Sequence, residues 1–213
     1  DLAKQVTVQL CGVEFRESCR KHLRKTEPTF DIRRSLDAFE DHFDVVTLFH
    51  VLEHLPYQSL VLRQVRKRLN PNGVIIVELP HACDLLLQWV DLPEFRALTF
   101  WSEHLILHTE PSLRSVLQNA GFTDIQIYGY QRYGYTNHLK WFLDRKPGGH
   151  ESLKELEDES MEAVYREYLE KIGATDTLIA TARANGKGSC NDEVDTEGRS
   201  VGLCRSRAYH DCQ

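Results

Sequence analysis

The sequence contains no apolar run long enough to span a membrane, and its polar opening, DLAKQ, has none of the features of a secretory signal. Basic residues are in the minority: 26 Lys and Arg stand against 32 Asp and Glu, for a formal net charge of −6. A general surface for nucleic acid or for an anionic membrane needs a basic face, so the balance argues against both partners. We therefore expect a cytoplasmic protein.

The cysteines lack the spacing of a metal site and of a disulfide framework. Three occur in apolar or helical contexts and three in a polar C-terminal stretch: Cys11, Cys19 and Cys83, then Cys190, Cys204 and Cys212. This distribution predicts free thiols in a reducing compartment.

Strand-like and helix-like patterns alternate along a chain long enough for one domain. The expected strands are 6–15, 31–36, 43–52, 74–80, 122–131 and 176–183, and the expected helices are 17–25, 57–69, 109–122 and 150–173. Strands rich in Val, Ile and Leu that alternate with amphipathic helices indicate an α/β fold with a doubly wound, mostly parallel sheet and helices on both faces.

Two of these segments predict specific packing. The strand 43–52 is apolar enough to be buried on both faces. The helix 57–69 presents one apolar stripe, formed by Leu60, Val61, Val65 and Leu69.

End signals define two further helices. Thr109 is the expected N-cap of the helix 109–122, and Gly121 lies past its end. The acidic segment 150–173 predicts one long helix that ends at Gly173.

Ionisable side chains follow two strands at the point where each strand ends. Glu14 closes the first strand, and His50, Glu53 and His54 close FDVVTLFHVL. Open parallel sheets bind ligands outside the carboxyl ends of their strands, so we expect these groups to line one opening. A carboxylate at the end of a nucleotide-binding strand accepts hydrogen bonds from two ribose hydroxyls, although a solvated strand-end carboxylate explains Glu14 equally well.

Four stretches in the same order resemble the class I S-adenosylmethionine-dependent methyltransferases, and within them a bacterial subgroup that acts on small molecules and sugars. They are Gly12-Val13-Glu14, FDVVTLFHVLEHL, LNPNGVIIVELP and SLRSVLQNAGF. The resemblance covers residues 1–183 and implies a Rossmann-like methyltransferase domain with an antiparallel last strand, in which 132–175 form a helical cover. Residues 184–213 have lost all periodicity, and their composition predicts a disordered tail.

The resemblance also implies S-adenosyl-L-methionine as cofactor and assigns the residues that bind it. These are Glu14 at the ribose, Ser35 and Leu36 beside the adenine, Phe49, His50 and Val51 at the methionine part, and Glu53 in the same cleft.

The glycine-rich loop G-x-G-x-G that the family places after its first strand is absent from the sequence. In dinucleotide-binding folds such a loop precedes the acidic residue by about 20 residues, which places it upstream of Asp1. We therefore expect a chain that lacks the first strand of its sheet, and that by itself binds S-adenosylmethionine weakly or not at all.

Two histidines are candidates for the base that removes a proton from the acceptor. His104 lies in FWSEHLILHT, which is similar to a segment of sugar C-methyltransferases, and Glu103 is placed to orient it. His54 ranks second, because the resemblance suggests a structural role for it. Glu103 and His104 are equally explained by hydrogen bonds that hold their loop on the sheet. Further along the sequence, four side chains either cover the acceptor or pack on the core: Tyr133, Tyr135, Asn137 and His138.

A metal site is the alternative to this assignment. H-x-x-E-H at 50–54 resembles the E-x-x-E-H of small-RNA 3′-end methyltransferases, with His81 or His104 as a further ligand. Position 50 is His rather than Glu, which removes an oxygen ligand that hard cations prefer, so we expect no metal. Two other functions stay open: an inactive fragment that serves as an interaction module through 150–173, and a dehydrogenase in which Glu14 meets a nicotinamide ribose.

Overall fold

A computed structural model describes residues 9–100 and 104–184. The strands are β1 Cys11–Val13, β2 Asp31–Arg33, β3 Phe43–Phe49, β4 Leu69–Pro80, β5 Phe122–Tyr130 and β6 Thr177–Ala184. Four of them form the main sheet in the order β3-β4-β6-β5, and β1 pairs with β2 in a separate small sheet. The predictions for Glu103 and for residues 185–213 of the expected tail lie outside the described residues.

The main sheet contains both parallel and antiparallel strand pairs, as expected for a parallel α/β sheet with an antiparallel last strand. Strand β3 runs parallel to β4, with Phe49 opposite Glu78. Strand β6 inserts between β4 and β5 and is antiparallel to both, so β3, β4 and β5 share one direction. The antiparallel last strand is therefore confirmed.

Helices connect the strands. The α-helices are α2 Glu17–Thr26, α3 Gln58–Arg68, α4 Pro93–Thr99, α5 Glu110–Asn119, α6 Tyr135–Asp144, α7 Gly149–Ser152 and α8 Glu159–Ile172. Shorter turns are 3-10 helices at Leu36–Ala38, Leu52–His54 and Lys154–Leu156 and a π-helix at Leu85–Trp89.

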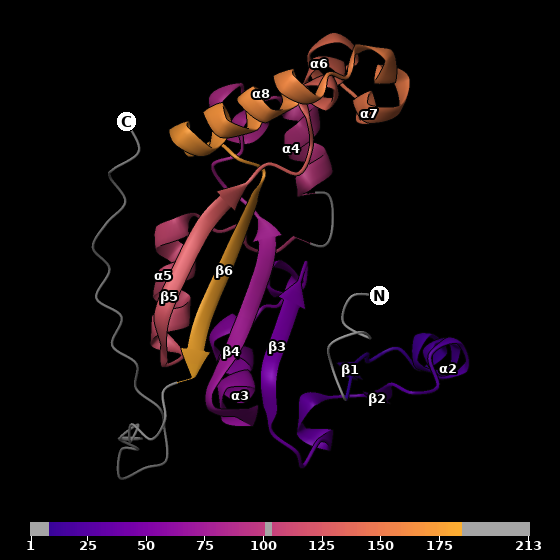
Figure 1. Cartoon of the computed structure of the whole chain (residues 1–213), viewed down its shortest axis with the longest axis vertical. Coiled ribbons are helices and arrows are strands. Elements are labelled where there is room, and N and C mark those ends of the chain that lie inside the picture. The colour runs from indigo at the N-terminus through magenta and orange to yellow at the C-terminus, as the bar shows by residue number, and fades with distance from the viewer. Residues whose placement is uncertain (1–8, 101–103, 185–213) are drawn as a thin grey trace.

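The core lies between the main sheet and the pair α3 and α5, which cover one face (Figure 1). Alternate residues of β4, namely Ile75, Val77 and Leu79, point into this layer, where they meet the buried Leu62 of α3 and Leu113 of α5. Period-two burial on the strand and a narrow apolar stripe on each helix are what such a two-layer contact requires.

The opposite face of the main sheet is open in the described residues, which corrects the prediction of helices on both faces. Val45 and Phe49 of β3 are each 52% exposed, so β3 is not buried on both faces either. Helix α2 does not cover these β3 residues, because it lies with the separate β1–β2 sheet. The guanidinium of Arg20 donates to the carbonyl oxygens of Glu14 and Phe15 and so ties α2 to the end of β1.

Of two helix predictions, one is confirmed and one is corrected. Helix α5 is confirmed: the Thr109 hydroxyl accepts the Ser112 N–H, and Gly121 takes φ +87° past the end. The stripe of α3 is shifted, because Leu60 is 51% exposed whereas Leu62 is buried. Positions 60 and 62 are about 200° apart on a helix, so the predicted stripe places the wrong one of two leucines in the core.

Two predicted elements are shorter than expected. The acidic segment 150–173 breaks into α7, a 3-10 turn and α8, because the Asp158 side chain caps a new helix start; α8 does end at Gly173 in the left-handed conformation. Strand β2 ends at Arg33, so Ser35 and Leu36 do not end the strand: Ser35 is the N-cap of the following 3-10 turn and Leu36 is its first residue.

The carboxyl ends of β3, β4 and β5 all point toward one end of the molecule. Helices α4, α6, α7 and α8 gather over that end (Figure 1). No helix in the described ranges has the length and apolarity to cross a lipid bilayer.

Candidate functional site

Strand β3 ends in a sharp turn that brings ionisable groups together. His50 takes φ +51°, and its backbone N–H donates to the Glu78 carbonyl oxygen at 2.8 Å. The ring of His50 lies between two carboxylates, with Nε2 at 3.1 Å from Glu78 Oε1 and Nδ1 at 3.4 Å from Glu53 Oε1. The Arg132 guanidinium approaches the same Nε2 at 2.7 Å. A cation, an imidazole and two acids therefore meet at the parallel edge β3–β4.

Glu53 lies beneath this group with a side chain that has no exposed surface. Neither carboxylate oxygen receives a hydrogen bond from the described residues. His54 Nε2 is 3.8 Å from Oε1, and the rings of His54 and His104 are 4.9 Å apart. The fold thus places His104, from a distant segment, beside the Glu-His pair of the β3 turn.

Backbone hydrogen bonds hold the two segments together. The N–H groups of Leu105 and Ile106 both donate to the Glu53 carbonyl oxygen, at 2.9 and 3.3 Å. The Gln58 side chain donates to the Leu52 carbonyl oxygen at 2.8 Å and contacts His108 Nε2 at 2.8 Å. Gln58 and His108 are buried, whereas Leu105 and Ile106 are exposed, so the turn after β3 is joined to segment 104–108 by backbone hydrogen bonds and by one buried polar pair.

A cavity of ≈ 400 Å³ opens beside this cluster, between the strand ends and the helices above them. His50, His104 and Arg132 contribute to its wall, together with an apolar side formed by residues such as Phe95 and Trp141. A few convergent polar groups on a largely apolar wall are typical of small-molecule sites.

Burial shifts the pKa of two groups that line this cavity. It raises the pKa of Asp84 to about 7. The backbone N–H groups of Leu86 and Leu87 donate to the Asp84 carboxylate and act in the opposite direction, because they stabilise its charged form. Burial lowers the pKa of His138 to about 4, and the His138 Nδ1 lies 2.6 Å from the Tyr165 hydroxyl oxygen. Burial therefore favours the neutral form of both groups.

Asp176 positions Arg132. Its carboxylate accepts the backbone N–H groups of Arg132 and Tyr133 and one N–H of the Gln131 side chain. Burial raises the pKa of Asp176, and these donors oppose that shift. The strand end of β5 is thus tied to the start of β6.

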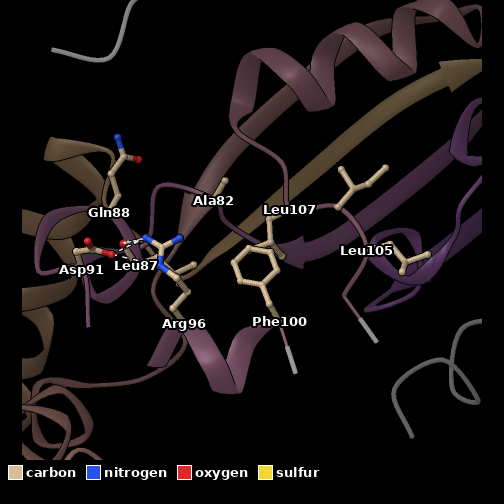
Figure 2. Close-up of a pocket in the computed structure, with 9 residues that line it drawn as sticks. Ala82, Leu87, Gln88, Asp91, Arg96, Phe100, Leu105 and Leu107 are labelled. Carbon is tan, nitrogen blue, oxygen red and sulfur yellow. Dashed lines mark hydrogen bonds and ion pairs between the residues drawn. The ribbon is translucent and has the colours of Figure 1, made fainter. Parts of the chain in front are cut away.

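A second cavity, of ≈ 520 Å³, is lined in part by residues 105–107 and is drawn in Figure 2. Phe100, Leu105 and Leu107 form its apolar wall, and Arg96 pairs with Asp91 at its rim. None of the residues that line it is a predicted catalytic or cofactor-binding residue.

The structure brings together only part of the predicted site. His50, Glu53, His54 and His104 form one cluster. Glu14 lies in the separate β1–β2 sheet, where its Oε1 accepts the Arg16 N–H at 2.7 Å. The shared opening of Glu14 and Glu53 stays a prediction, as do the roles of Ser35, Leu36, Phe49 and Val51.

Sequence reasoning missed Glu78, Asp84 and Arg132. The signal for Glu78 was present, because it is the one charged residue near the end of the apolar strand VIIVELP. Arg132 follows β5 by two residues, and only the pairing of β5 with β6 brings it to His50. Of the two extra histidines that were considered as metal ligands, the fold selects His104, since the ring of His81 is engaged with the Thr175 carbonyl oxygen.

The comparisons with known proteins agree with this geometry. The family model of a methyltransferase domain matches residues 1–127. The chain therefore belongs to the methyltransferase domain family.

Similar curated proteins are named as probable S-adenosylmethionine-dependent methyltransferases. One from Mycolicibacterium smegmatis is 32% identical over 85 residues, which are 38% of this chain and 33% of that protein. One from Mycobacterium tuberculosis is 26% identical over 133 residues, 61% of this chain and 46% of that protein. The chain thus spans between a third and a half of the length of these relatives.

Solved structures share the fold. A SAM-dependent methyltransferase from Archaeoglobus fulgidus superimposes with a TM-score of 0.54 at 20% identity, over 85% of this chain and 79% of that one. Phosphoethanolamine N-methyltransferase 2 of Haemonchus contortus, solved in complex with S-adenosyl-L-methionine, gives 0.51 at 12% identity, over 86% and 45%. The Rossmann-like fold class predicted from the sequence is therefore confirmed.

Proposed function

We propose that the protein transfers a methyl group from S-adenosylmethionine to a small-molecule or sugar-type acceptor. The observation that carries this proposal is the ≈ 400 Å³ cavity at the carboxyl ends of β3 and β4, to whose wall His104 contributes. Brought to this edge, the sulfonium cofactor supplies an electrophilic methyl group, and the chain has to align an acceptor and accept its proton.

The cavity supports an acceptor of limited size. Its volume suits a ligand of drug or metabolite dimensions, and the helices of segment 132–175 lie over the same end of the sheet (Figure 1). The neutral state that burial favours for His138 keeps that part of the wall compatible with an uncharged, hydroxyl-bearing molecule. Arg132 and Asp176 line the same cavity at the strand ends, where their polar side chains are placed to form hydrogen bonds with the acceptor.

Glu14 fits the contact with the cofactor ribose. Its side chain is 22% exposed, and the Arg16 N–H fixes one of its oxygens at the carboxyl end of β1. A ligand can therefore reach an oriented carboxylate. Loss of one charge-assisted hydrogen bond in Glu14→Gln is expected to weaken cofactor binding by about tenfold or more, as measured by calorimetry on the full-length protein.

His104 is the proposed general base and His54 the second candidate. His104→Ala should reduce transfer of a tritiated methyl group to a panel of sugars and amino alcohols by about 100-fold or more, with unchanged cofactor affinity. His42→Ala, at an exposed position before β3, is the matched control and should retain full transfer.

Two outcomes would count against the assignment. Full turnover by His104→Ala removes His104 from the mechanism and directs the same test to His54. Absence of cofactor binding by the full-length protein favours instead an inactive domain that acts through its surface, and the enzyme proposal then fails.

A further inference from the structure

A buried carboxylate without a hydrogen-bond donor lies in the turn after β3. The Glu53 side chain has no exposed surface, and neither of its oxygens accepts a hydrogen bond within the described residues. Burying an ionised carboxylate is costly unless a counter-charge or a metal ion compensates it. An ionised Glu53 carboxylate therefore needs a positive group beside it.

Nitrogen atoms that are able to ligate an ion surround this carboxylate. One ligand atom each from Glu53, His54 and His104 lie within 4.8 Å of one another. The Nδ1 atom of His104 is itself buried without a hydrogen-bond partner in the described chain. A carboxylate and an imidazole nitrogen, each buried and without a hydrogen bond in the described residues, thus lie in the same small volume.

We infer that Glu53, His54 and His104 bind one divalent transition-metal ion of the zinc class. Ligand atoms about 2.0 to 2.2 Å from a tetrahedral ion lie roughly 3.4 Å apart. The cluster is wider than this, so binding requires the three side chains to close by about an ångström. We expect rotation of the His54 and His104 side chains to supply this movement, because the hydrogen bonds of Leu105 and Ile106 to the Glu53 carbonyl oxygen hold the two backbones together.

The donor set selects the kind of ion. Two imidazoles and one carboxylate are a ligand set of zinc sites that keep an open position, whereas magnesium prefers oxygen ligands. The sequence argued against a hard cation because position 50 is His. That objection does not apply to zinc, and His50, which lies between Glu78 and Glu53, is not one of the three ligands.

The open position would face the acceptor cavity, to whose wall His104 contributes. An ion there is placed to orient an oxygen atom of the acceptor, and this role rests on the function proposed above. Metal binding and proton abstraction are alternative tasks for His104, because a nitrogen lone pair that is bound to an ion cannot accept a proton. A metal titration therefore separates the two.

The experiment titrates zinc into full-length protein against a chromophoric chelator, and repeats the titration with cobalt as a spectroscopic probe. Cys190, Cys204 and Cys212 are replaced by serine in every sample, so that polar-tail thiols do not bind the added zinc. We expect one equivalent of zinc per chain and a cobalt spectrum of tetrahedral type.

The ligand variants Glu53→Gln, His54→Ala and His104→Ala should each weaken zinc binding at least about tenfold, while His42→Ala should bind as the parent does. If Glu53→Gln fails to fold, as judged by circular dichroism, the two histidine variants still carry the test.

Zinc affinity that is equal in the parent, His54→Ala and His104→Ala would overturn the inference, as would the absence of binding at micromolar zinc. In that case the His50 and His54 rings are simply the polar neighbours of Glu53, and His104 stays available as a base. A protein that binds zinc through these residues but neither binds cofactor nor transfers methyl groups contradicts the proposed function alone.

Discussion

The buried carboxyl of Asp84 makes a quantitative prediction about stability. Asp84 begins the π-helix Leu85–Trp89, where its Oδ1 accepts the N–H groups of Leu86 and Leu87, and burial raises its pKa from 3.8 to about 7. A shift of this size corresponds to about 4 kcal/mol, at about 1.4 kcal/mol per pH unit. The charge of Asp176 adds to the shift.

The sign follows from the proton affinities. The folded state binds the Asp84 proton more tightly than the unfolded state, so this group favours folding below pH 4 and loses that contribution as the pH rises through about 7. The substitution Asp84→Asn keeps an oxygen acceptor for the two N–H groups but has no proton to lose. Relative to the parent, the variant should therefore gain about 2 to 3 kcal/mol of unfolding free energy between pH 5 and pH 8.

The assay is urea denaturation of parent and variant at pH 5, 6, 7 and 8. The comparison between pH values cancels any constant cost of the substitution. Asp41→Asn, at an exposed position, is the control and should follow the parent at each pH. Parallel profiles for parent and Asp84→Asn, within about 0.5 kcal/mol, would show that the carboxyl is not the source of a pH-dependent cost.

Two further predictions concern packing and backbone conformation. Leu113→Ala should lower the unfolding free energy by about 2 to 5 kcal/mol in urea denaturation, because Leu113 is fully buried between α5 and the sheet, whereas the exposed Leu60→Ala should change it by less than about 0.5 kcal/mol. Gly121→Ala and Gly173→Ala should each cost about 1 kcal/mol for a left-handed backbone. Gly121→Ala should cost more than Gly173→Ala, because a Cβ at position 121 would lie 3.0 Å from the Arg66 Nε, whereas a Cβ at position 173 would have no atom within 4 Å. Equal decreases in the thermal unfolding midpoint would contradict this.

Local signals account for what could be predicted of the site. EHL follows an apolar strand in the sequence, so the placement of Glu53 and His54 at a strand end required only the pattern of a few residues. The surroundings of Glu53 were not predictable in this way, because His104 and the N–H donors to the Glu53 carbonyl oxygen come from segment 104–106, about 50 positions along the chain. The same holds for Arg132, whose contact with His50 spans 82 positions.

The sequence by itself determined the order and type of most strands and helices, including the Thr109 cap and the Gly121 and Gly173 ends, since these depend on dihedral preferences and hydrogen bonds within a few residues. Only the tertiary structure decided that β6 inserts between β4 and β5, that one face of the sheet is open in the described residues, and that His104 meets Glu53. Those outcomes depend on hydrogen bonds and packing between residues far apart in the chain, and a local pattern carries no record of which distant partner completes it.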